Sequence, residues 1–175
     1  MNGIATIRFG AARAAVTAGL LSLALNAPAE AELLELDQTI YGMDCAPCAI
    51  GVERRIAGLD GVSEVTLSLN KGNAVATFER DNRITLEQIR EAIRRNAFNP
   101  REARITVGAE IALDDDGRRV LVTGAGERFV LKPDDAAPEA FKQLDAVGVG
   151  ERAVVTGSVP AGKEGPWTLA VAELH

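Results

Sequence analysis

The chain has 175 residues, of which 19 are Lys or Arg and 25 are Asp or Glu, so its formal net charge is -6 with histidine neutral. This acidic balance argues against a nucleic-acid partner, which needs clustered Lys and Arg to neutralise phosphates. The single His is too few for a multi-histidine metal cage, and it leaves only one residue that could serve as a histidine general base. The composition therefore disfavours hydrolytic sites built on several histidines.

The amino-terminal segment has the pattern of an export signal. Arg8 and Arg13 precede a leucine-rich apolar run, and the small residues that follow suit cleavage after Ala29. This run is shorter than the roughly 20 residues of a membrane-spanning helix, and no later segment is apolar enough to span either, so we expect no membrane insertion after the signal is removed. An amphipathic first helix of the mature protein is the alternative, but no charge interrupts 14–28. We therefore expect a signal peptide at 1–29 and a periplasmic mature protein.

The next part of the chain has the element order strand, helix, strand, strand, helix, strand. Apolar spacings predict strands at 33–41, 65–69, 74–78 and 103–107 and helices at 47–59 and 86–98. Pro47 suits the first turn of the first helix, and Thr85 with Gln88 forms a capping-box signature before the second. With right-handed crossovers, this order predicts a ferredoxin-like βαββαβ sandwich.

After Gly108 the sequence changes to short Val-rich runs separated by turn clusters. These runs predict strands at 119–123, 128–131, 152–156 and 167–174. The spacing of Phe141, Leu144 and Val147 predicts one short helix between the second and third runs. Such a pattern suggests a small β-rich barrel of OB-like topology. The predicted fold class is therefore α+β, with a ferredoxin-like domain at 32–108 and a small β-rich domain of unknown function at 109–175.

Both cysteines of the chain, Cys45 and Cys48, lie directly before and inside the start of the first predicted helix. A disulfide across so short a loop would add little stability, since the chain-entropy gain reaches about 3 kcal/mol only for loops near 15 residues. The partial positive charge of a helix N-terminus favours thiolate, which is the form that binds metal. Soft sulfur ligands select copper(I), zinc or mercury(II) over magnesium and calcium. The pair therefore predicts a site for one soft metal ion.

Residues 34–107 resemble the heavy-metal-associated domain of copper chaperones, metal-exporting ATPases and mercury-scavenging periplasmic proteins. The resemblance rests on the Gly-Met-x-Cys-x-x-Cys loop that begins at Gly42, on the element order, and on recurrent family residues at Gly61, Val62, Val65 and Phe98. It implies that Cys45 and Cys48 are the metal ligands. It also implies that Met43 packs under the loop and that Phe98 lies beside the site. By their residue types alone, both of these could equally be ordinary core residues.

Asp44 departs from the commonest residue of the family at its position, which is Thr. Similar domains in zinc-exporting ATPases carry Asp there, where the resemblance implies a third, carboxylate ligand. Zinc accepts oxygen beside sulfur more readily than copper(I) does, so Asp44 would direct the site towards divalent ions. A solvated loop acid is the alternative interpretation, because loops favour Asp for turn chemistry alone.

We therefore expect a non-enzymatic exported protein that captures or transfers one soft metal ion, Cu(I), Zn(II) or Hg(II). Its expected partner is a membrane metal transporter or another metal-binding domain. The main alternative is a periplasmic thiol-disulfide oxidoreductase, since Cys-x-x-Cys at a helix start is also the redox arrangement. Asp44 opposes that alternative, because thioredoxin-like proteins carry Trp there and a neighbouring carboxylate disfavours a thiolate.

A third interpretation places the function in the carboxyl-terminal part, as a partner-binding module with the metal site as its sensor. The acids Asp114, Asp115 and Asp116 could attract calcium, but they lack the remaining ligands of a calcium loop and are expected to form a solvated turn. His175 is expected to be a frayed terminus and not a metal ligand.

Overall fold

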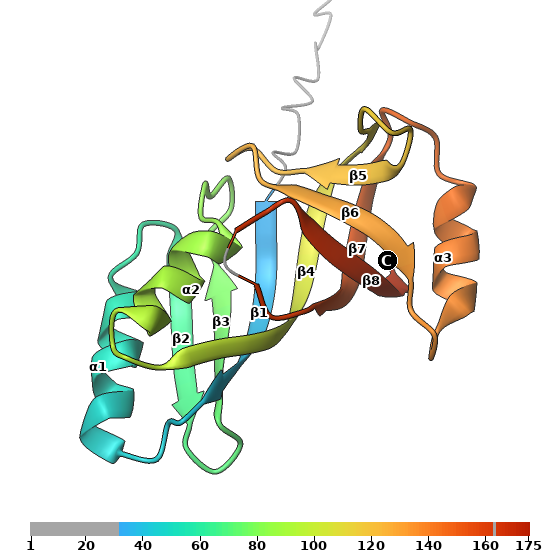
Figure 1. The fold of residues 1–175 in the computed structure, drawn as a ribbon. Helices are drawn as coiled ribbons and strands as arrows, with labels where there is room; N and C mark the ends of the chain where they lie inside the picture. The colour runs from blue at the N-terminus through green and yellow to red at the C-terminus, as the bar shows by residue number, and fades with distance from the viewer. Residues whose placement is uncertain (1–31, 163) are drawn as a thin grey trace, which may run out of the picture.

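The computed structural model describes residues 32–162 and 164–175, so the predicted signal peptide at 1–29 lies outside the described residues (Figure 1). The elements within the described ranges are β1 (Glu32–Tyr41), α1 (Ala46–Ala57), β2 (Val62–Ser68), β3 (Asn73–Phe78), α2 (Leu86–Arg94), β4 (Asn99–Leu113), β5 (Arg119–Val122), β6 (Arg128–Pro133), α3 (Pro138–Asp145), β7 (Arg152–Val159) and β8 (Trp167–Leu174).

The first six elements confirm the predicted ferredoxin-like order. The strands lie side by side as β2, β3, β1 and β4, and every pairing among them is antiparallel. In this register Leu36 of β1 lies opposite Ala76 of β3 and Ile105 of β4. The helices α1 and α2 contact each other and cover one face of these strands (Figure 1).

Local sequence signals account for most of these elements. Along the second half of β1, buried Leu36, Gln38 and Ile40 alternate with exposed residues, as a sheet with one covered face requires. At the start of α2, the Thr85 hydroxyl accepts the backbone N–H of Gln88 at 3.2 Å, and the Gln88 side-chain oxygen accepts the backbone N–H of Thr85 at 2.9 Å. The predicted capping box is thereby confirmed.

The second helix ends earlier than its apolar spacing predicts. It was expected over 86–98, but it stops at Arg94. Ala97 is exposed and has a φ of 63°, a left-handed conformation that ends a helix. The Phe98 N–H then bonds to the Ile93 carbonyl at 3.4 Å, which closes the terminus and directs the chain into β4.

The strand β4 joins the two parts of the chain. It was expected only over 103–107, but it runs from Asn99 to Leu113. One edge pairs with β1 and then with β5, while the other pairs with β7. All eight strands therefore belong to one sheet, in the order β2-β3-β1-β4-β5-β6-β8-β7. The division into domains at 108/109 falls inside this strand and stays a prediction.

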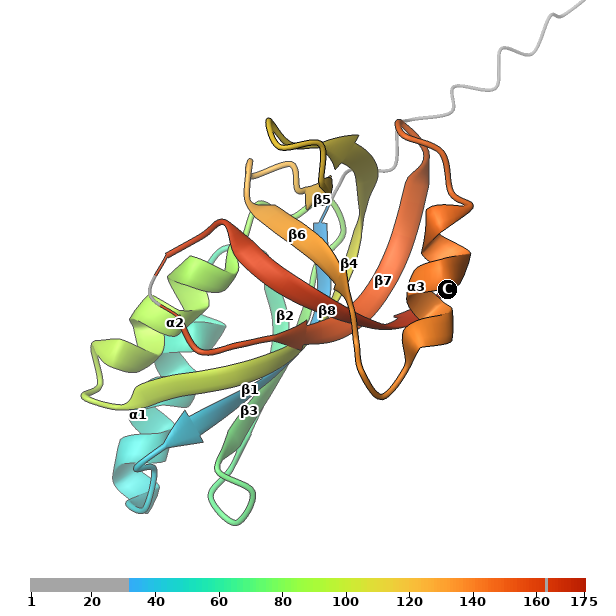
Figure 2. The same cartoon turned by 45° about the vertical axis from the view of Figure 1, so that its right-hand side comes forward.

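The carboxyl-terminal strands and helix lie where the sequence predicts them, and the strands form a ring. β5 pairs with β4 and β6, and β8 pairs in parallel with β6 and antiparallel with β7. β7 then returns to β4 and completes the ring, as Figure 2 shows. The helix α3 packs against β8 and β6.

The buried apolar side chains of both parts form a single hydrophobic cluster, which includes Ile89 of α2, Val107 of β4, and Phe129 and Leu169 of the ring. None of these four side chains is exposed to solvent. In the described ranges, no helix combines the length and the apolar character that crossing a membrane requires. The core is therefore continuous from the first unit into the ring.

A charged contact holds α2 against the ring. Glu127, in the turn between β5 and β6, accepts the backbone N–H groups of Leu86 and Glu87 at 2.9 and 3.3 Å. It also accepts the indole N–H of Trp167 at 2.7 Å. A carboxylate at a helix N-terminus satisfies free N–H groups and interacts favourably with the helix dipole. The ring therefore supplies part of the amino-terminal cap of α2.

Arg90 extends this contact into the core. Its side chain is fully buried, with the guanidinium 4.7 Å from the centre of the Trp167 ring. It donates to the Gln38 side-chain oxygen at 3.1 Å and to the backbone carbonyls of Arg101 and Val159 at 3.1 and 3.4 Å. Burial, with a smaller contribution from the charge of Arg94, lowers the pKa of Arg90 to about 10. We refer to Arg90, Trp167 and Glu127 together as the clamp.

The clamp predicts a pH dependence of stability. Burial raises the pKa of Glu127 above its usual value of 4.5, and its three N–H donors offset this only in part. The folded chain therefore binds the proton of Glu127 more readily than the unfolded chain does. The resulting stabilisation is complete below the unfolded-state pKa and is lost as the pH rises through the folded-state pKa. We predict that, relative to Glu127→Gln, the free energy of unfolding of the native chain increases as the pH falls from 7 to 4.5. Urea denaturation across this range measures it, and a flat or opposite difference would contradict the assignment.

The shared strand and the clamp predict that the first unit depends on the ring. In a fragment of residues 32–113, all of β4 remains, but Arg90 loses its contacts with Val159 and Trp167. We expect this fragment to unfold at a lower temperature than the full chain, with Trp167→Phe in the full chain giving an intermediate shift. Circular dichroism during heating measures both, and a fragment as stable as the full chain would be inconsistent with the dependence.

Candidate metal centre

The two cysteines lie where β1 ends and α1 begins. Gly42 has a φ of 87°, a backbone conformation that favours glycine, and it turns the chain out of β1. The Asp44 N–H then bonds to the Gly42 carbonyl at 3.1 Å. Cys45 is the extended N-cap of α1, and its carbonyl accepts the N–H of Ala49 at 3.0 Å. Pro47 lies in the first helical turn, as predicted.

This local geometry brings the two sulfur atoms together. The Cα atoms of Cys45 and Cys48 are 5.2 Å apart, and the side chains are joined as a disulfide. Cys45 is partly buried and Cys48 is exposed, so the pair lies at the surface. The sulfurs therefore point to one shared position from the loop and from the first turn of the helix. The oxidised pair has no thiolate, so metal binding by these sulfurs requires its reduction.

Two opposing influences set the electrostatics of the pair: the N-terminus of α1 favours thiolate, and the exposed acid Asp44 directly before Cys45 disfavours it. The first turn of α1 contains no acidic residue, whereas Arg54 and Arg55 lie in its last turn. The partial positive charge at the amino end is therefore not compensated by a carboxylate within the helix, and it stabilises thiolates formed when the pair is reduced.

The other residues predicted for the site have different positions. Met43 is buried in the hydrophobic core directly before the loop, with 6% of its surface exposed. Phe98 is partly buried and packs against the same core, while Asp44 is exposed. In the part of the chain that the structure describes, no group of three or more His, Cys, Asp or Glu side chains is arranged to hold a metal ion. The roles of Asp44 as a third ligand and of Phe98 as a neighbour of the site stay predictions.

One aromatic contact near the end of β1 was not anticipated from the sequence. Tyr41 is 66% exposed, and the guanidinium of Arg101 lies 5.0 Å from the centre of its ring. The two side chains are brought together because β1 and β4 pair here, with Tyr41 opposite Asn99. Only this long-range pairing could have indicated the contact, since nothing in either local sequence does.

Two further expectations concern the carboxyl-terminal part. Asp114 forms a turn in which it accepts the Arg118 backbone N–H and its guanidinium, each at 2.8 Å, and these contacts lower the pKa of Asp114. His175 is not frayed: its N–H bonds to the Val154 carbonyl at 3.0 Å, and its ring lies 2.9 Å from the Thr156 hydroxyl. The expectation of a free terminus was wrong because β7 and β8 pair almost to the end of the chain.

Comparison with known proteins identifies the family of the first unit. The model of the heavy-metal-associated domain matches residues 39–99. The copper chaperone CopZ of Staphylococcus saprophyticus is 35% identical over 60 residues, which are 34% of this chain and 87% of that protein. The periplasmic component of the mercuric transport proteins of Shigella flexneri is 32% identical over 75 residues, which are 43% of this chain and 81% of that protein.

A solved structure, oxidized MerP from Ralstonia metallidurans, matches 40% of this chain and 93% of its own with 26% identity and a TM-score of 0.34. The family assignment rests on the sequence matches, which span the loop, both of its cysteines and the paired elements that hold it. This chain belongs to the heavy-metal-associated domain family.

Proposed function

We propose that this protein is a non-enzymatic carrier that captures one soft metal ion through Cys45 and Cys48 and transfers it to a partner. The observation that supports this most strongly is the convergence of the two sulfurs, at the surface and at the amino end of α1, in a chain of the heavy-metal-associated family. Similar proteins are named as a copper chaperone and as a mercuric transport component. Two thiolates suffice for an ion that accepts linear coordination.

Capture requires a defined redox and proton balance. Reduction of the disulfide consumes two electrons and two protons from a dithiol donor and yields two thiols. Binding of Cu(I) or Hg(II) then releases those protons and forms two metal–sulfur bonds. In transfer, a thiolate of the partner attacks the bound ion, a new metal–sulfur bond forms and one bond to this protein breaks. Stepwise exchange through shared coordination avoids free metal.

The same proposal includes the location and the partners. The pattern of residues 1–29 supports export, and one group of similar proteins is named as periplasmic. An exported carrier that delivers metal into the cell needs a membrane metal transporter or another metal-binding domain as its partner. We propose Cu(I), Zn(II) and Hg(II) as the candidate ions, because all three bind thiolate well.

A second candidate function is supported by the oxidised state of the pair. A surface disulfide whose Cys48 is exposed could also exchange with thiols, as in a thiol-disulfide oxidoreductase. The acid Asp44 directly before Cys45 argues against a reactive thiolate. The membership of the chain in a metal-binding family favours the carrier.

For the carboxyl-terminal part, we infer an OB-like barrel as a second domain at 109–175, after the metal-binding domain at 32–108. The ring order β4-β5-β6-β8-β7 and the position of α3 between β6 and β7 support this inference. The strand β4 then contributes to both units.

The carrier function predicts stoichiometric binding by the reduced protein. We expect the reduced chain to bind one Cu(I) or Hg(II) ion in anaerobic titration, and Cys45→Ser or Cys48→Ser to weaken binding by more than about 100-fold, because a hydroxyl does not replace a thiolate for a soft ion. Ala46→Ser is the matched control, since it adds a hydroxyl to the same loop and keeps both sulfurs. If the reduced chain binds none of copper(I), zinc and mercury(II) and reduces insulin rapidly, the carrier proposal is wrong and the oxidoreductase function is supported.

The proposed carboxylate ligand predicts a change of metal preference. If Asp44 supplies an oxygen to a divalent ion, Asp44→Thr lowers the zinc affinity about tenfold and leaves the Cu(I) affinity nearly unchanged. Competition titrations of both metals measure the ratio, with Asp60→Asn as a control acid at the other end of α1. If the zinc and Cu(I) affinities change by the same small factor, Asp44 is a solvated loop residue and not a metal ligand.

A further inference from the structure

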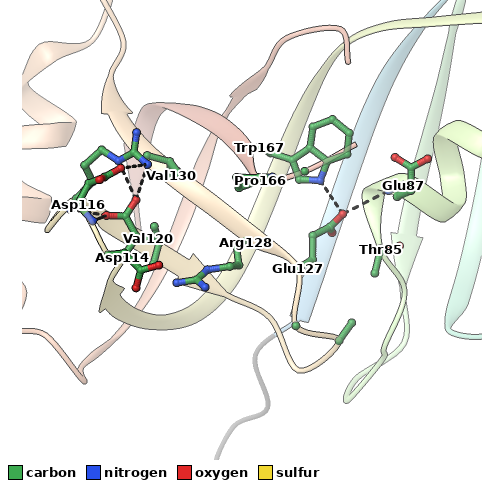
Figure 3. Close-up of a pocket in the computed structure, with 15 residues that line it drawn as sticks. Thr85, Glu87, Asp114, Asp116, Val120, Glu127, Arg128, Val130, Pro166 and Trp167 are labelled. Carbon is green, nitrogen blue, oxygen red and sulfur yellow. Dashed lines mark hydrogen bonds and ion pairs between the residues drawn. The ribbon is translucent and has the colours of Figure 1, made fainter. Parts of the chain in front are cut away.

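A pocket of about 510 Å³ lies between α2 and the ring, and it shares no residue with the cysteine loop. Figure 3 shows its lining side chains, which come from the amino end of α2, the β4–β5 turn, β5, the β5–β6 turn, β6 and the start of β8. A volume of this size is typical of pockets that receive several side chains or a small molecule. The pocket is therefore a second candidate site, built jointly by the two parts of the chain.

One end of the pocket carries two carboxylates, of which Glu87 is paired with a guanidinium and Glu127 is not. Glu127 accepts hydrogen bonds only from neutral N–H groups, which are the indole N–H of Trp167 and the first two backbone N–H groups of α2. Glu87, from α2, uses one oxygen for an ion pair with Arg94 at 2.7 Å, and its other oxygen is buried without a hydrogen-bond partner. Figure 3 shows Glu87 and Glu127 on the same side of the pocket as Trp167. A buried carboxylate oxygen without a hydrogen-bond donor costs free energy, so a ligand group that donates a hydrogen bond to it would bind favourably.

The opposite end carries the three acids of the β4–β5 turn. Arg118 pairs with Asp114 at 2.7 Å and with Asp116 at 3.0 Å, while Asp115 is exposed. Between the two ends lie the apolar side chains of Val120 and Val130 (Figure 3). The pocket therefore has acidic ends and an apolar middle.

The charges of the lining side chains do not balance. The lining contains five carboxylates and two guanidinium groups, and one of the latter, Arg118, is already held by its neighbouring acids. Arg128 contributes the other positive charge near the apolar middle (Figure 3). A negative potential in a partly apolar pocket attracts cations and repels phosphate groups. Nucleic acid and anionic membrane surfaces are therefore poor ligands for it.

We propose that this pocket is a docking groove for an extended segment of a partner protein in which a basic, an apolar and a second basic side chain stand at alternate positions, so that all three point to the same face of the segment. The basic groups would reach the carboxylates at the two ends, and the apolar group would pack on the partly exposed Val130. β5 is paired on both sides, with β4 and with β6, so the segment is recognised by side chains and not by addition of a strand. The groove would hold a partner while the cysteine loop, formed by other residues, remains accessible.

The test uses the full chain and a synthetic peptide, Gly-Ser-Lys-Ser-Leu-Ser-Lys-Ser-Gly, with Gly-Ser-Glu-Ser-Leu-Ser-Glu-Ser-Gly as its matched control. Trp167 is the only tryptophan of the chain and lines the pocket, so its fluorescence reports binding there. We expect saturable binding of the basic peptide that weakens with added salt, and no binding of the acidic peptide.

Charge variants then locate the binding. Glu87→Gln and Asp115→Asn should each weaken the basic peptide roughly twofold to fivefold, whereas Arg128→Ala should strengthen it by a similar factor. Glu139→Gln, on α3 and outside the pocket lining, is the matched control and should have no effect. The proposal would be overturned if both peptides bound equally or if the basic peptide did not bind at millimolar concentration. It would also be overturned if Glu87→Gln and Asp115→Asn left the affinity for the basic peptide unchanged.

The result is separable from the metal-binding function. Cys45→Ser and Cys48→Ser should leave the peptide affinity unchanged, because neither residue lines the pocket. Loss of peptide binding in those variants would instead place the peptide at the cysteine loop and contradict the groove.

Discussion

The close approach of Cys45 and Cys48 at the amino end of α1 is the constraint on which the function of this fold depends. Gly42 provides the left-handed turn that ends β1, and the burial of Met43 fixes the chain just before the loop. The helix then begins at Ala46 and carries Cys48 in its first turn, on the same side as Cys45. The backbone on both sides of the loop thus presents two sulfurs at one surface position.

The rest of the molecule is tied to this unit by one strand and one charged cluster. β4 pairs with β1 in the metal-binding unit and with β5 and β7 in the ring, so neither part has a sheet of its own. The clamp adds a buried guanidinium, an indole and a carboxylate between α2 and the ring. Because α2 also packs against α1, the helix that carries Cys48 belongs to the same continuous core as the ring. The pocket is a product of this union, since its walls come from both parts.

The sequence predicted features that depend on neighbours along the chain. The cysteine loop, Pro47 in the first turn of α1, and the capping box of Thr85 and Gln88 are local patterns, and each was found in place. The left-handed Ala97 was missed because helix termini of this kind usually carry glycine. The length of β4 and the clamp were missed because they depend on pairing between distant segments: Glu127 and Leu86 are 41 residues apart. Local sequence patterns do not reveal contacts between segments that are distant along the chain.

The most direct test of the central claim is X-ray absorption spectroscopy of the reduced, zinc-loaded full chain, which reports the atoms bonded to the metal. Ligation by Cys45 and Cys48 predicts a sulfur shell of two scatterers at about 2.3 Å, with any remaining ligands as lighter atoms at about 2.0–2.2 Å. A spectrum that contains only the lighter shell would show that the metal binds elsewhere and would contradict the account.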